Sequence, residues 1–114
     1  MKITLLIGFL VCVNVAMANG YNAEKIADAI YVIEGGKKTK YPYGIKSINT
    51  KGNAAKARQI CINTIHNTHK RWLAANKPIA FVDYLANRYC PPSVDKVGNR
   101  RWKANIRKFV EVKD

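Results

Sequence analysis

Acidic residues are scarce in this chain of 114 residues, which has 7 aspartates and glutamates against 20 lysines and arginines. The resulting net charge of +13 favours a polyanionic partner. In a cytosolic protein that partner would be nucleic acid. In an exported protein it would be the cell wall, with its peptide carboxylates and teichoic acids, or an anionic membrane surface.

Metal ligands are also few. The chain has 2 histidines, His66 and His69, three positions apart on a predicted helix that contains no acid. A helical zinc site favours two histidines four apart together with a carboxylate. We therefore expect both histidines on the solvated helix surface, and neither a metal nor another cofactor.

Other catalytic motifs are equally weak. A cysteine–histidine nucleophile is disfavoured because Cys61 faces the predicted core while His66 lies off that face. No glycine-rich phosphate loop of the required spacing is present.

Long hydrophobic runs are limited to residues 3–15. This run is shorter than the roughly 20 residues that a spanning helix needs, and Asn14 interrupts it. It follows the positive Lys2 and precedes an A-x-A cleavage signature that ends at Ala18. We therefore expect a secretory signal peptide over residues 1–18, cleaved after Ala18.

The expected mature protein, residues 19–114, is long enough for one small domain. It keeps 19 of the 20 basic residues against all 7 acids. We expect it to be a monomer in the periplasm or outside the cell. Export makes the envelope, and not nucleic acid, the expected partner.

Hydrophobic periodicity predicts a mostly helical domain. The first helix begins at the N-cap Asn22 and ends at Gly35-Gly36, and Asn53 caps a second helix at about 54–75. Pro78 suits the first turn of a third helix at about 79–88, and a polar turn over residues 93–98 precedes the last helix at about 99–110. Between the first two lies a loop, with at most a short β-hairpin or strand near residues 40–50. The side chains expected to face the core are Ile26, Ile30, Ile33, Ala54, Ala57, Cys61, Ile65, Thr68, Trp72, Phe81, Tyr84, Leu85, Trp102, Ile106, Phe109 and Val110.

Two cysteines, Cys61 and Cys90, remain in the expected mature chain. An exported protein with an even cysteine count admits a disulfide, which here would join the second and third helices. We expect this bridge, and two buried free thiols are the alternative.

One acid, Glu34, has an unusual position. Acids normally lie near helix N-termini, as Glu24 does, but Glu34 lies at a helix C-terminus, where the macrodipole opposes a negative charge. It is also one turn from Ile30 in the apolar stripe. Both features favour the protonated form, which a general acid requires. The alternative is a surface glutamate paired with Lys37 or Lys38.

The segment around Glu34 resembles the active-site segment of the lysozyme-like superfamily and is most similar to soluble lytic murein transglycosylases. Ile33-Glu34-Gly35-Gly36 stands for the family's Glu-Ser-Gly-Gly type of segment, and residues 43–48 stand for its Gly-Leu-Met-Gln region. Arg88-Tyr89-Cys90-Pro91-Pro92, with residues 99–105 after it, is similar to a stretch in short phage- and bacterium-encoded members. The glutamine of the second region is absent, since Lys46-Ser47 stands in its place.

The resemblance implies a small lysozyme-like helical domain that cleaves the β-1,4 bond between N-acetylmuramic acid and N-acetylglucosamine. Glu34 is then the catalytic acid and base. The residues expected to bind the glycan are Tyr41, Tyr43, Gly44, Ser47 and Tyr89, with Tyr89 as the expected hydrogen-bond partner of Glu34.

Three other functions stay open at this point. A hydrolytic lysozyme usually needs a second acid, and the loop after Glu34 offers none. A non-enzymatic cationic protein that binds walls or membranes would use Glu34 only structurally. A nucleic-acid-binding helical domain conflicts with the export signal. The biological use stays open among wall remodelling, assembly of an envelope-spanning machine and phage lysis.

Overall fold

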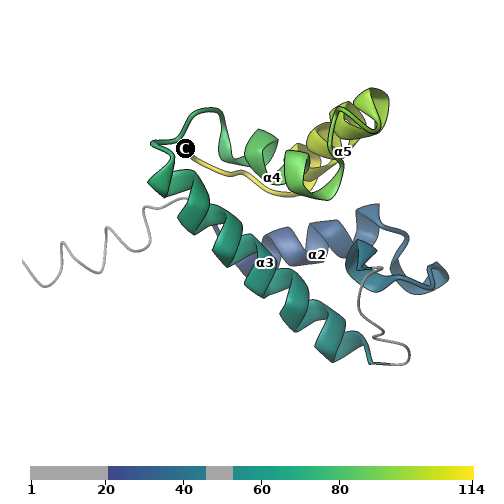
Figure 1. The fold of residues 1–114 in the computed structure, drawn as a ribbon. Coiled ribbons are helices and arrows are strands. Elements are labelled where there is room, and N and C mark those ends of the chain that lie inside the picture. Colours follow the sequence, from purple (N-terminus) through teal and green to yellow (C-terminus); the bar gives the residue numbers. More distant parts are fainter. Residues whose placement is uncertain (1–20, 46–52) are drawn as a thin grey trace, which may run out of the picture.

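Four α-helices and two 3₁₀ turns form the fold of the computed structural model, which describes residues 21–45 and 53–114 (Figure 1). The helices are α2 (Ala23–Ile33), α3 (Ala54–Ala74), α4 (Phe81–Tyr89) and α5 (Lys96–Phe109), and the turns are η1 (Gly36–Lys38) and η2 (Pro42–Gly44). The predicted small, mostly helical domain is confirmed.

The predicted strand is not found in the described part of its region. Residues 40–45 contain the turn η2 and no strand, and the remainder of the region lies outside the described residues. The predicted signal peptide, residues 1–18, also lies outside them.

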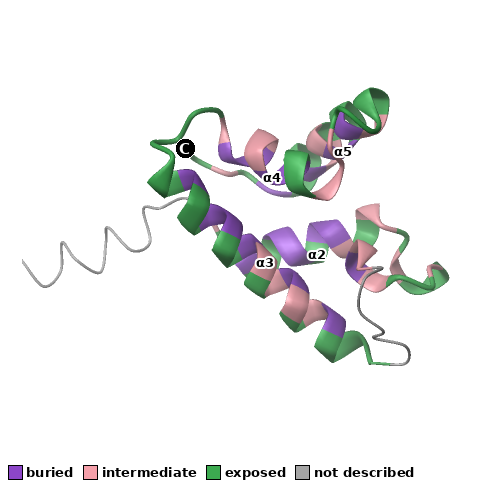
Figure 2. Ribbon diagram, in the orientation of Figure 1, coloured by how far each residue is buried: buried purple, intermediate pink, exposed green. Residues whose placement is uncertain are grey.

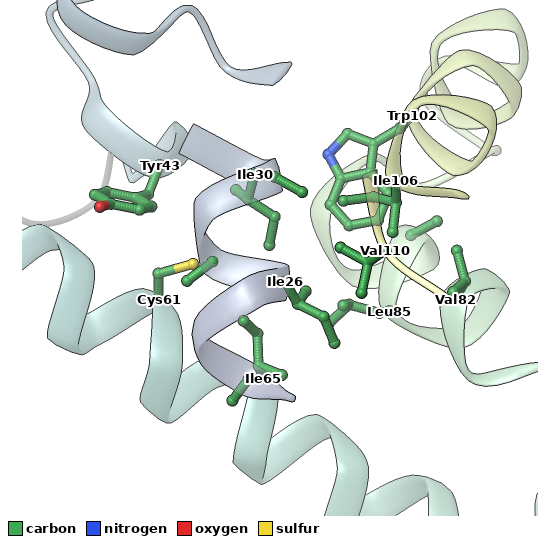
Figure 3. Packing of buried hydrophobic residues seen from close by; sticks show 14 of the residues in the cluster. Ile26, Ile30, Tyr43, Cys61, Ile65, Val82, Leu85, Trp102, Ile106 and Val110 are labelled. Atoms are coloured by element: carbon green, nitrogen blue, oxygen red, sulfur yellow. The ribbon is translucent and has the colours of Figure 1, made fainter. Parts of the chain in front are cut away.

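α2 lies at the centre of the helix packing. It contacts α3 on one side and α5 on the other, while α4 packs against both α3 and α5. Figure 2 shows the buried positions on the sides of the helices that face one another, and Figure 3 shows how their side chains meet. The fully buried large side chains all belong to the predicted core, and they are Trp72, Phe81, Ile26, Ile30, Ile65, Leu85, Ile106 and Cys61. Ala54, also predicted there, is exposed because it is the first residue of α3.

Side-chain caps begin the first two helices where the sequence predicts. The Asn22 side chain accepts hydrogen bonds from the backbone of Glu24 and Lys25, and Asn53 accepts one from Lys56. Although α3 has 21 residues, no helix in the described ranges is both long and apolar enough to cross a membrane.

α4 begins at Phe81, two residues later than predicted, and Pro78 lies outside it. The connection before it is held by the Trp72 indole, whose N–H donates to the Ile79 carbonyl at 2.7 Å. The cap comes from the other end of the chain, because the Asp114 carboxylate accepts a hydrogen bond from the Phe81 backbone at 2.8 Å. Sequence reasoning had no local signal for this long-range cap.

α5 begins at Lys96, three residues earlier than predicted, because Asp95 is its N-cap. The Asp95 carboxylate accepts a hydrogen bond from the Gly98 backbone at 2.8 Å, so the expected polar turn is the first turn of the helix. Phe109 was expected in the core and is 58% exposed, because α5 ends there and Val110 turns inward in its place.

His69 was expected on the surface and is instead buried, with 7% of its area exposed. The Tyr21 ring stacks on the imidazole, with centroids 3.9 Å apart, and Phe81 meets it edge-on at 4.9 Å. Burial lowers the pKa of His69, and the nearby charges of His66 and Lys77 lower it further. The expected exposure of His66 is confirmed.

We predict that acidification destabilises the fold through His69. The unfolded histidine takes up a proton near pH 6.5, whereas the folded one, with its lowered pKa, resists protonation. The unfolded state therefore binds the proton first, and the free energy of unfolding falls by up to about 1.4 kcal/mol per pH unit below about pH 6.5. Thermal unfolding followed by circular dichroism between pH 5 and 8 measures this slope. A His69→Phe variant keeps an aromatic ring at this position and should lose the pH dependence of stability. An equal slope in both proteins contradicts the prediction.

Candidate functional site

Glu34 is the residue at which α2 ends. Its backbone N–H still bonds to the Ile30 carbonyl at 2.9 Å, and Gly35 follows with a φ of 106°, which turns the chain away from the helix axis. A left-handed glycine after the last helical residue is a common way to end a helix. The Glu34 side chain is half-buried at this end of α2.

The indole of Trp102, on α5, holds the Glu34 carboxyl group. Its Nε1–H donates to Oε1 of Glu34 at 3.3 Å, which joins residues 68 positions apart. Figure 3 shows the indole nitrogen directed toward the part of α2 that carries Ile30. The Tyr89 ring stacks on Trp102, with centroids 5.2 Å apart and planes 17° from parallel, and so supports the indole from α4.

The turn η2 closes the other side of the carboxyl group. A Cβ atom on Gly44 would lie 2.9 Å from Cδ of Glu34, which is too close without a shift of the carboxyl, and the φ of Gly44 is 70°. Glycine is therefore required here both by its backbone angle and by the close approach to the carboxyl group. η2 itself packs against α2 and α3.

Tyr89 and Cys61 form a buried polar pair beside the site. The hydroxyl of Tyr89 and the thiol of Cys61 lie 3.3 Å apart. Burial raises the pKa of Cys61 to about 11. Burial also raises the pKa of Tyr89, and the interactions of Tyr89 with Cys61 and Glu34 raise it further. Cys61 therefore stays a neutral thiol near pH 7, which agrees with its rejection as a nucleophile.

The expected disulfide is absent, because Cys61 and Cys90 are both free thiols in the structure. Cys61 is fully buried and contacts Tyr89, while Cys90 follows α4 and is only partly covered. The alternative of two free thiols describes the structure better.

Only some of the expected glycan-binding residues lie near the Glu34 carboxyl group. Gly44 contacts the Glu34 carboxyl group, and Tyr89 reaches it through Trp102 and not by the direct hydrogen bond that we expected. Tyr43 is only 5% exposed, because its ring packs 5.1 Å from that of Tyr31, so it supports η2 and offers little surface to a ligand. Tyr41 is 46% exposed, and Ser47 lies outside the described residues.

Glu34 has no ion pair with any cation in residues 21–45 or 53–114, so the alternative of a pair with Lys37 or Lys38 is not seen there. Other acids are occupied elsewhere. Asp28 pairs with Arg58, and Asp83 pairs with Arg107. Asp95 and Asp114 cap α5 and α4.

Trp102 is the functional candidate that sequence reasoning missed. Its helical spacing with Ile106 placed it in the core, where it is indeed buried. The feature that could have identified Trp102 as a site residue is its indole N–H, because a buried indole N–H usually has a hydrogen-bond acceptor. That acceptor lies on a distant helix and is not visible in the local pattern.

No family model, curated protein or solved structure matches this chain. The resemblance to lytic transglycosylases therefore stays a prediction. Among the described residues, no cluster of three or more histidine, cysteine or acidic side chains is placed to hold a metal ion.

We predict that Gly44→Ala moves the Glu34 carboxyl group and weakens its bond to Trp102. Alanine at a positive φ costs about 1–2 kcal/mol of folding stability, and the added methyl group also displaces the carboxyl. The indole N–H signals in a ¹⁵N correlation spectrum report this, since the 2 tryptophans give separate signals. The Trp102 signal should shift, while that of Trp72, bonded to Ile79, should stay.

The matched control for this experiment is Gly36→Ala. Gly36 also has a positive φ, 55°, but its Cβ would make only an ordinary 3.5 Å contact with Tyr31. The Gly36→Ala variant should lose a similar amount of folding stability, and both of its indole N–H signals should stay where they are in the wild type. An unmoved Trp102 signal in Gly44→Ala would show that the turn does not hold the carboxyl group.

Proposed function

We propose that this protein is a peptidoglycan lytic transglycosylase, with Glu34 as its single catalytic acid and base. The observation that carries the proposal is the environment of this carboxyl group. It lies half-buried at a helix C-terminus, held by one neutral indole donor and enclosed by the Gly44 backbone, with no cation paired to it in the described part of the chain.

The first step of the proposed reaction needs a protonated carboxyl group. The Glu34 carboxyl group pairs with no cation in the described part of the chain and accepts one hydrogen bond, from a neutral indole. Glu34 donates its proton to the glycosidic oxygen of N-acetylglucosamine while the bond from that oxygen to C1 of the muramyl sugar breaks. C1 takes on oxocarbenium character.

The second step uses the carboxylate that remains. Glu34 removes the proton of the muramyl C6 hydroxyl, and the oxygen O6 forms a bond to C1, which closes a 1,6-anhydro ring. No water is consumed, and the carboxyl group returns to its protonated form. The Trp102 indole N–H stabilises the carboxylate between the two steps.

A one-carboxylate mechanism suits this chain because the other acids have other roles. All 7 acids lie within the described residues, and four of the remaining six form ion pairs or helix caps. Glu24 is an exposed residue in the first turn of α2, at the opposite end from Glu34. Glu111 is exposed after α5. A hydrolytic lysozyme usually draws on a second carboxylate across the cleft.

The basic surface supports a wall polymer as substrate. Lys37, Lys38 and Lys40 are exposed on the segment that joins Glu34 to η2. Peptidoglycan carries carboxylates on its peptides, so cations next to the site favour its approach and binding. Tyr41 is also exposed on this segment, and an aromatic ring can pack against a sugar ring.

We expect Glu34→Gln to abolish the release of muropeptides from purified peptidoglycan, because an amide can neither donate nor accept the transferred proton. Mass spectrometry of the wild-type products should show anhydro-muramyl ends, about 18 mass units lighter than hydrolysed ends because no water is added. Circular dichroism should show an unchanged fold. The matched control is Glu24→Gln, on the exposed first turn of the same helix, which should retain activity.

Three outcomes distinguish the alternatives. Hydrolysed ends in place of anhydro ends would identify a muramidase. Full activity of Glu34→Gln on cells, without muropeptide release by either protein, would identify a cationic binding protein. Selective binding of nucleic acid by the unprocessed chain in the cytoplasm would overturn both envelope functions.

We also expect Trp102→Phe to lower kcat while leaving the fold intact. Phenylalanine keeps an aromatic ring against Tyr89 and removes the N–H that binds Glu34. A hydrogen bond to a charged group contributes about 1.5–3 kcal/mol, which corresponds to a loss of about ten- to a hundredfold. Trp72→Phe is the control, since its indole bonds to Ile79 and not to Glu34. An equal loss of kcat in both variants would assign Trp102 a structural role only.

A further inference from the structure

A second candidate site lies between α3 and α4, apart from Glu34. It is a surface hollow of about 240 Å³ lined by Thr68, Arg71, Tyr84, Asn87 and Arg88. Two of these residues come from the C-terminal half of α3 and three from α4, which pack against each other. The hollow is smaller than the pockets of about 300–1,000 Å³ that hold drug-sized ligands, so it suits a small group.

The polar groups of this hollow are mainly hydrogen-bond donors. Both guanidinium groups, of Arg71 and Arg88, are exposed and make no ion pair within the described ranges, unlike Arg58 and Arg107, which pair with aspartates. The amide oxygen of Asn87 is already occupied, because it accepts a hydrogen bond from Asn99 at 3.1 Å. Its amide nitrogen is left to donate.

No acid lines the hollow, and the remaining residues provide apolar surface. The Thr68 hydroxyl donates to the Thr64 carbonyl at 2.7 Å, which fixes its methyl group within α3. Tyr84 adds a half-buried ring that ends in a hydroxyl, and the two arginines add their methylene stems. Two guanidinium groups beside a partly apolar surface suit a ligand that has a carboxylate next to a short apolar group.

We propose that this hollow binds the terminal carboxylate of a peptide, with Arg71 and Arg88 as the recognition residues. The assignment to a wall peptide rests on the proposed function, because peptidoglycan is the polymer in which such carboxylates hang from the glycan.

The placement of the hollow agrees with this reading. Thr68 lies seven residues along α3 from Cys61, about 10 Å at 1.5 Å per residue. Cys61 contacts Tyr89, whose ring stacks on the indole that holds Glu34. Tyr89 also directly follows Arg88 of the hollow in α4, so the hollow and the Glu34 site share this helix.

Binding is best measured without turnover, in the Glu34→Gln protein. The probes are N-acetyl-D-alanyl-D-alanine, the same dipeptide with a C-terminal amide, and inorganic phosphate. In a ¹⁵N titration, the free dipeptide should shift the amide signals of Tyr84 and Asn87, while its amide form should not. Arg71→Gln and Arg88→Gln should each weaken binding about ten- to a hundredfold, as expected for a charge-assisted hydrogen bond.

Arg100→Gln is the charge-matched control, because Arg100 is exposed on α5 and does not line the hollow. It should leave binding unchanged. Equal binding of the amide form, equal weakening by Arg100→Gln, or phosphate binding as tightly as the dipeptide would each overturn the proposal.

The two proposals fail separately. If the hollow does not bind the dipeptide, release of muropeptides by the wild-type protein still supports the catalytic role of Glu34. Conversely, if the protein binds the dipeptide but releases no muropeptides, the proposed transglycosylase activity is rejected. The hollow then remains a binding site for a peptide carboxylate.

Discussion

The burial of α2 on two sides is the constraint on which the rest of the structure depends. Ile26 and Ile30 are fully buried, and three alanines of the same helix are buried with them. Each buried isoleucine contributes about 1.5–3 kcal/mol, and the small alanines allow neighbouring helices to approach closely. α3 and α5 therefore pack on opposite sides of α2 (Figure 3), and the end of α2 cannot move independently of either.

This constraint gives Glu34 its environment. Since α5 packs on α2, the indole N–H of Trp102 reaches Glu34, the C-cap of α2. Since α4 packs on α3 and α5, Tyr89 stacks on Trp102 while its hydroxyl contacts Cys61 of α3. Residues of α3, α4 and α5 thus form one series of contacts, from Cys61 through Tyr89 and Trp102, that ends at the carboxyl group of Glu34.

The sequence predicts the local features of this arrangement well. The stripe of Ile26 and Ile30, the N-caps Asn22 and Asn53, and the glycine stop after Glu34 each follow from the chemistry of a few neighbouring residues. The misplaced features depend on distant partners. α4 begins where Asp114 caps it, and His69 is buried because Tyr21 covers it. The Trp102–Glu34 bond is of the same kind, since no pattern of spacing relates residues 68 positions apart.

Most of the few acids in this chain have a structural partner. A chain with 20 basic residues gains stability from each acid that pairs with a cation or caps a helix, and four of the 7 acids do one of these. Glu34 does neither, although Lys37 and Lys38 follow it closely in sequence. Its oxygen accepts from a neutral indole instead, at the helix end where a negative charge is least favourable. Glu34 therefore takes no part in the pairing and capping that occupy the four aspartates, and this is the ground on which a chemical role for it is proposed.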